Sequence, residues 1–110
     1  MIKKTIAELE EKVRQLDSME HGNRAELLTL LASLKTEIEE LAKTCRDDAE
    51  SILGFATVST HESMRQEKNP HLVKLSLEGL ASSVKGFETS HPTLVGTVNR
   101  ICVMLSNIGI

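Results

Sequence analysis

The chain has 110 residues and a formal net charge of −3, and 40% of its residues are hydrophobic but only 2% are aromatic. At this length it can form one small domain with a modest core. Two aromatic residues, Phe55 and Phe87, are too few for the strands of a typical β-sandwich or for stacking on nucleic-acid bases, and no basic cluster accompanies them. The composition therefore favours an all-α protein and argues against nucleic-acid binding.

The sequence gives no sign of secretion or of a membrane span. No stretch approaches the roughly 18 apolar residues that cross a bilayer. Glu8, Glu10 and Glu11 follow the opening Met-Ile-Lys-Lys, where a signal peptide would be apolar. Cys45 and Cys102 each lie within an apolar helical stripe, which favours small buried residues over a disulfide or a metal site. We therefore expect a cytoplasmic protein without a membrane span.

Apolar residues over 2–16 recur at alternating steps of four and three, the spacing of helices that pack together. They are Ile2, Ile6, Leu9, Val13 and Leu16. Polar residues follow at Asp17-Ser18 and His21-Gly22-Asn23. They predict a short turn, after which the next helix returns antiparallel to the first.

A second stripe begins after Asn23, which is expected to cap the helix. It comprises Leu27, Leu31, Leu34, Ile38, Leu41 and Cys45, and Ala49, Ile52 and Ala56 continue it in register. We predict a long second helix from Asn23 to about Thr57, roughly 50 Å in length if it continues past Asp47-Asp48, and the stripe alone does not decide between continuing and stopping there. The first helix is too short to cover it, so the surplus apolar surface must contact the C-terminal helices or a second chain.

The C-terminal half predicts two further helices. Residues 61–69 read as a polar linker, and Asn69-Pro70 is a strong helix start. Two more stripes follow: Val73, Leu77, Leu80, Val84 and Phe87, then Leu94, Val98, Ile101, Leu105 and Ile108. The predicted architecture is a single domain, 1–110, in which hairpins 1–60 and 70–110 form a four-helix bundle or a coiled-coil-like assembly.

Glu88-x-x-His91 is the one spacing that points to chemistry, because paired Glu-x-x-His segments bind metal in di-iron helical bundles. Only one such pair is present here, and Pro92 should displace His91 from the helical face. None of the predicted stripes contains an inward carboxylate. We therefore expect no metal, cofactor or catalytic residue, and we expect Ser90 and His91 to cap a helix.

Two segments near the end of the sequence are distinctive: Gly86-Phe87-Glu88-Thr89-Ser90-His91-Pro92-Thr93-Leu94 and the closing Ile108-Gly109-Ile110. They resemble the Phe-Glu-x-Ser-His-Pro-x-Leu segment and the Gly-Ile end of a bacterial family of short proteins, domain of unknown function 4404. Residues 46–67 depart from the family pattern by being longer. The resemblance implies a bacterial, soluble, helical protein and carries no established activity. The candidate signature residues are Phe87, Glu88, Ser90, His91, Pro92, Leu94, Gly109 and Ile110.

Three functional hypotheses follow from these patterns. The leading one is a non-enzymatic structural or adaptor element that self-associates, most readily as a dimer, through the surplus surface of the long helix. The alternative is a module that docks a helix of another protein on that same stripe. A metal-binding bundle centred on Glu88 and His91 has the least support.

Overall fold

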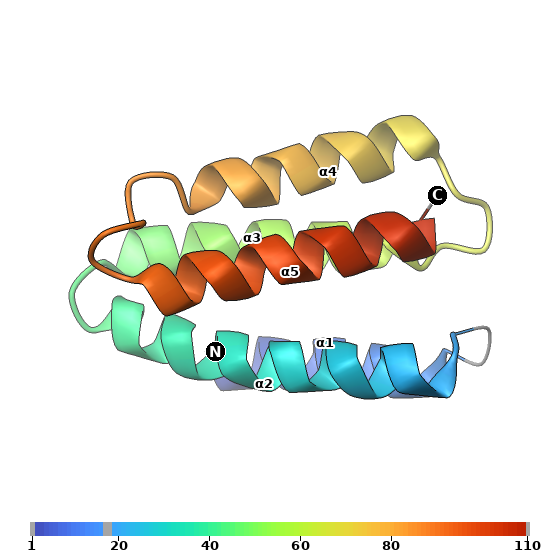
Figure 1. The fold of residues 1–110 in the computed structure, drawn as a ribbon, viewed down its shortest axis with the longest axis horizontal. Helices are drawn as coiled ribbons and strands as arrows, with labels where there is room; N and C mark the ends of the chain where they lie inside the picture. The colour runs from blue at the N-terminus through green and yellow to red at the C-terminus, as the bar shows by residue number, and fades with distance from the viewer. Residues whose placement is uncertain (1, 17–18, 110) are drawn as a thin grey trace.

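The computed structural model describes residues 2–16 and 19–109, and these fold into helices without any strand (Figure 1). The helices are α1 (Ile2–Gln15), α2 (His21–Ala42), α3 (Arg46–Ser63), α4 (Pro70–Ser83) and α5 (Pro92–Gly109). The predicted all-α class is therefore confirmed. The turn expected at Asp17 and Ser18 lies outside the described residues.

Helix α3 is the central element, because it packs against each of the four other helices. Helices α1, α2, α5 and α3 close a ring of four, since each packs against the next. Helix α4 lies over α3 and α5, on the side away from α1 and α2 (Figure 1). The resulting bundle measures 38 × 25 × 22 Å.

The predicted apolar stripes form the core. Every helix contributes at least one aliphatic side chain with no exposed surface, for example Ile6, Leu34, Ile52, Leu80 and Leu105. Burying an aliphatic side chain of this size stabilises the fold by about 1.5–3 kcal/mol relative to leaving it in water. Because aromatic residues are scarce, branched aliphatic side chains provide most of this stabilisation.

The predicted long second helix is wrong. Helix α2 ends at Ala42 and α3 begins at Arg46, so the described residues form five helices where four were predicted. Cys45 lies between them with non-helical angles, φ −133° and ψ 67°. Its amide still donates to the Leu41 carbonyl at 2.8 Å and its carbonyl accepts from the Ala49 amide at 3.0 Å, so the chain reverses with little loss of backbone hydrogen bonding.

Packing energy explains why the helix breaks. Folding back at Cys45 brings Leu41 and Ile52 into one core, where both are fully buried. A continuous helix of roughly 50 Å would leave the second half of its stripe in water. The acidic pair Asp47 and Asp48 then lies in the first turn of α3, where negative charge favours a helix start.

Other boundaries also differ from the predictions. Helix α2 starts at His21, with Glu20 rather than Asn23 at its N-cap. Helix α3 continues to Ser63, because Ser59, Thr60 and Ser63 pack against neighbouring helices and are buried. The connection therefore starts after Ser63, three residues later than the predicted linker, 61–69.

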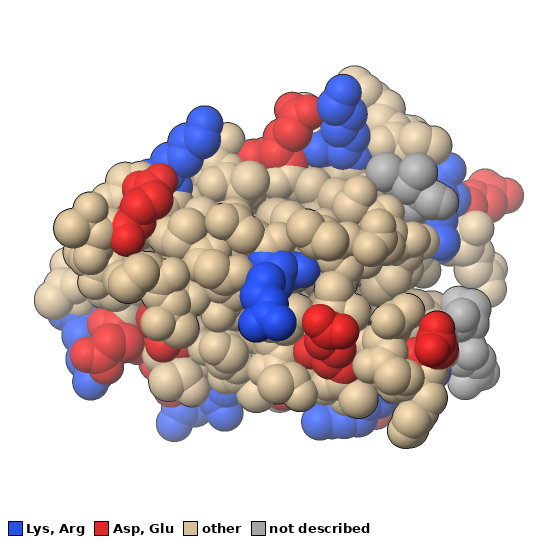
Figure 2. All heavy atoms as spheres, viewed as in Figure 1, with Lys and Arg blue, Asp and Glu red and all other residues tan. Residues whose placement is uncertain are grey.

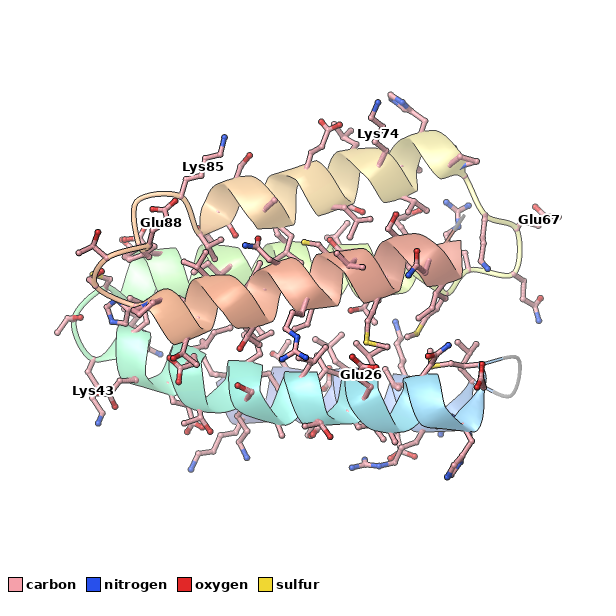
Figure 3. The ribbon with its side chains drawn as sticks, in the orientation of Figure 1. Glu26, Lys43, Glu67, Lys74, Lys85 and Glu88 are labelled. Carbon is pink, nitrogen blue, oxygen red and sulfur yellow. The ribbon has the colours of Figure 1, made fainter. Side chains whose placement is uncertain are left out.

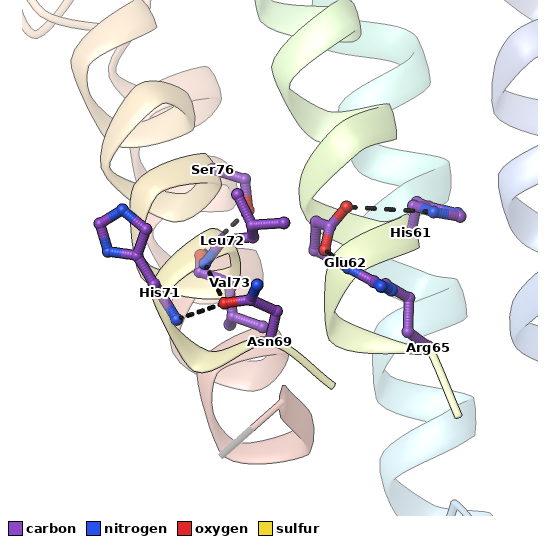
Figure 4. Close-up of polar contacts among 8 residues, drawn as sticks. All are labelled: His61, Glu62, Arg65, Asn69, His71, Leu72, Val73 and Ser76. Atoms are coloured by element: carbon purple, nitrogen blue, oxygen red, sulfur yellow. Dashed lines mark hydrogen bonds and ion pairs between the residues drawn. The ribbon is translucent and has the colours of Figure 1, made fainter. Parts of the chain in front are cut away.

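The start of α4 agrees with the sequence prediction. The Asn69 side chain accepts hydrogen bonds from the amides of His71 at 3.1 Å and Leu72 at 3.2 Å (Figure 4). Across the connection, Arg65 forms an ion pair with Glu62 of α3 at 2.8 Å (Figure 4). These contacts define the two ends of the connection from α3 to α4.

Small residues bring α3 and α4 close together. The Ser59 hydroxyl donates to the Ser76 carbonyl at 2.9 Å, and both residues are buried. At Gly79 an added Cβ would lie 2.5 Å from the Phe55 ring, so the ring packs directly over the glycine. The small side chains of Ser59 and Ser76 and the missing side chain of Gly79 allow the two helices to approach each other at these positions.

Candidate functional site

The signature segment begins with a turn that ends the α4 region. Gly86 has φ +98°, a left-handed conformation that glycine adopts without strain. Its amide donates to Glu88 Oε1 at 2.7 Å, and the Phe87 amide donates to the Val84 carbonyl at 3.2 Å. Helix α4 therefore ends before Phe87, the last residue of the third predicted stripe, which nevertheless packs against the core from the turn.

The Ser90-His91-Pro92 segment leads directly into α5. The His91 amide donates to the Phe87 carbonyl at 2.8 Å, and the His91 carbonyl accepts from the Val95 amide at 3.2 Å. The His91 ring packs edge-on against Phe87, with centroids 5.8 Å apart, and Nδ1 lies 3.0 Å from Ser90 Oγ. His91 thus lies immediately before the helix, and Pro92 is its first residue.

The candidate residues do not form one site. Leu94 is fully buried in the core, one turn into α5. Gly109 is buried at the far end of that helix, about 26 Å from Pro92 at the usual rise per residue. A Cβ there would meet Val73 Cγ1 at 2.9 Å and the Ser63 backbone at 3.3 Å, so glycine permits this close contact. Ile110 lies outside the described residues.

The chemistry of the signature turn is local. The Glu88 carboxylate is exposed and bonded to its own turn, and the Ser90 hydroxyl contacts the adjacent ring. Over residues 2–16 and 19–109, no three or more His, Cys, Asp and Glu side chains gather as a group that could hold a metal ion. The geometry of Glu88 and His91 is that of a turn that fixes the entry of α5.

A different surface has the features of a binding site. An open groove of about 640 Å³ runs between α4 and α5. Val103, one of the residues that line it, is 62% exposed, the largest value among the exposed large hydrophobic residues of the described chain. The residues that define the groove are Lys74, Leu77, Glu78, Ala81, Cys102 and Val103, and we call this surface the α4–α5 face.

The α5 side of this face carries little charge. Arg100 is the only charged residue among the 18 residues of α5. Figure 2 shows a largely uncharged surface over this helix, interrupted by one basic group near the middle of the view, with most other charged side chains towards its margins. Lys74 projects from the outer edge of α4, and Glu26 lies on α2 across from α5 (Figure 3). The scarcity of charge in α5 was visible in the sequence, but the groove depends on which helix lies beside it.

The thiol of Cys102 is half-buried at the base of this groove. Its Sγ donates a weak hydrogen bond to the Leu77 carbonyl at 3.9 Å. Burial raises the pKa of the Cys102 thiol above its ordinary value of 9.0, because the thiolate would lose solvation. As the pH rises through 9.0, the Cys102 thiol therefore ionises in the unfolded chain before it ionises in the folded chain. The free energy of unfolding consequently decreases as the pH rises through this range.

We expect iodoacetamide to alkylate Cys102 several-fold more slowly at pH 8 in the folded protein than in urea, because only the thiolate reacts. The measurement is a mass-spectrometric time course of alkylation on the Cys45→Ser variant, in which Cys102 is the remaining thiol. A short unstructured cysteine peptide, run in both solvents, corrects for the effect of urea on the reagent. Equal corrected rates would contradict the burial of this thiol.

The fold and this surface define the chain as an all-α helical bundle with an apolar groove on one face. None of the described helices combines the length and the hydropathy needed to cross a bilayer. A family model described as a domain of unknown function, DUF4404, matches residues 2–110, and the chain belongs to that family. The match thus extends well beyond the C-terminal segments that carried the resemblance. Neither a curated protein nor a solved structure matches the sequence.

Proposed function

We propose that this protein is a non-enzymatic structural or adaptor element that binds another helical surface through its α4–α5 face. The observation that carries the proposal is exposed Val103 beside an apolar groove, on a helix with a single charged residue. Interface cores are depleted in charge, and a groove between two helices is a common seat for a third.

The break at Cys45 changes which surface can act in this way. The sequence-based hypotheses relied on apolar residues of the long helix that the first helix could not cover. Those residues pack inside the chain itself, where Ile38, Leu41 and Ile52 are fully buried. A partner therefore has to bind elsewhere. The α4–α5 face supports such a contact because it joins a projecting side chain to a concave apolar surface.

A second exposed apolar patch, on α3 and α4, is the alternative binding surface. Phe55 is 42% exposed, Val58 49% and Leu75 55%. Phe55 packs over Gly79 of α4, and Leu75 precedes that glycine by one helical turn. Val58 follows Phe55 by three residues on α3, so Phe55, Val58 and Leu75 form one patch. This patch provides the matched comparison for the α4–α5 face.

Photo-crosslinking in living cells tests the proposal. A diazirine-bearing aliphatic residue replaces Val103, Val58 or the exposed Lys43 in the full chain. We expect a discrete adduct from position 103 and no comparable adduct from position 43, which lies at the end of α2 (Figure 3). Adducts from position 58 alone would transfer the function to the α3–α4 patch. The absence of adducts from every position would contradict the proposal.

A further inference from the structure

We infer that the surface bound by the α4–α5 face is a second copy of this chain, related by a two-fold axis that sets α4 antiparallel to the partner's α4. This inference rests on the proposed function and specifies its partner. Two chains related in this way present the same patch to each other, so the patch must complement itself.

The charges bordering the groove have this self-complementary arrangement. Lys74 and Glu78 lie one turn apart on α4, with opposite signs, and both line the groove. Among the ion pairs of the described residues, neither takes part in one. When α4 faces an antiparallel copy, each Lys74 lies opposite the partner's Glu78, so the contact forms twice.

The same axis also aligns the apolar part of the face. The contact between Cys102 Sγ and the Leu77 carbonyl places these two residues at the same height in the bundle. Leu77 lies between Lys74 and Glu78 along α4, and Val103 follows Cys102 on α5. An axis at the height of Leu77 therefore sets Val103 against the partner's Val103 while it pairs the charges.

The opposite edge of the face is also balanced in charge. A second groove, beyond Val103, is lined by Glu26 of α2 and by Arg100 of α5. One acidic and one basic residue thus flank each side of Val103. Each edge of the face is therefore neutral in sum at pH 7.

The side of the bundle that carries the face limits the area that a dimer can bury. A specific interface buries about 800 Å² on each partner. The side of the bundle seen in Figure 1 extends 38 by 25 Å, and α5 lies on it. A two-fold contact centred on Val103 would therefore use most of this side of the bundle, including surface beyond the two grooves.

Sedimentation equilibrium of the full chain at micromolar concentration tests this arrangement. We expect twice the chain mass of 12.1 kDa. Lys74→Glu and Glu78→Lys should each weaken the dimer about tenfold, because each creates two like-charged contacts. The double variant, Lys74→Glu with Glu78→Lys, should restore an affinity close to that of the parent chain.

Val103→Glu should yield a folded monomer, with helicity checked by circular dichroism, and Val58→Glu should leave the dimer intact. A dimer that survives Val103→Glu, or that the double charge variant does not restore, would overturn the arrangement. A monomeric parent chain whose position 103 crosslinks to a different protein would overturn the second-copy inference and leave the proposed function standing.

Discussion

Replacement of Ile52 by alanine is expected to lower the free energy of unfolding by about 2–5 kcal/mol. Ile52 has no exposed surface and lies on α3, the helix that packs against each of the others. Truncation removes buried methyl and methylene groups and leaves a cavity that rigid neighbours close only in part. Small domains are stable by about 5–15 kcal/mol, so this loss is a large fraction of the total.

Urea unfolding followed by circular dichroism measures this loss. Val58→Ala is the control, since Val58 lies on the same helix and is 49% exposed. Its effect should stay within about 0.5 kcal/mol. If the two variants unfolded at the same urea concentration, Ile52 would not occupy the centre of the core.

The second large effect is expected at Ser59, where a leucine should destabilise the protein by about 1–3 kcal/mol. Ser59 is fully buried between α3 and α4, and its hydroxyl bonds to the Ser76 carbonyl. A leucine there would force the two backbones apart and disturb the packing of Phe55 over Gly79 nearby. The hydroxyl's hydrogen bond would also be lost.

Two matched variants separate volume from hydrogen bonding. Ser59→Ala removes the hydroxyl without adding bulk and should cost about 1 kcal/mol. Ser51→Leu adds the same side chain at an exposed position of α3 and should be nearly neutral. The midpoint temperatures of thermal unfolding rank the stabilities of the three variants. Ser59→Leu behaving like Ser51→Leu would mean that α3 and α4 are not in close contact.

The sequence predicted the helices well where a single face decides the structure. The alternation of four and three placed residues such as Leu34, Leu80 and Leu105 correctly in the core, because a helix buries one stripe whatever its neighbours are. The alternation did not predict the break at Cys45, because the apolar residues before and after the break keep the same four-three spacing. The spacing of apolar residues is the same for one long helix and for two helices that fold back on each other, so it does not distinguish them.

The candidate site likewise includes one feature that the sequence predicts and one that it does not. The turn before Pro92 is a local property, and its role in starting α5 could be inferred from the proline itself. The α4–α5 groove is not local, because it exists only where Leu77 and Cys102, distant in sequence, lie side by side. The one charge among the 18 residues of α5 was a usable signal, but it became interpretable only when the outward face of that helix was known.

The central position of α3 has a consequence for cooperativity. Divided at the α3–α4 connection, the first three helices would expose residues that α4 and α5 normally cover, and the last two would lose the helix against which both pack. Neither half retains a closed core, so neither is expected to persist without the other. The bundle should therefore open as one unit, and slowly exchanging amides on α1 and α5 should lose protection together under native conditions.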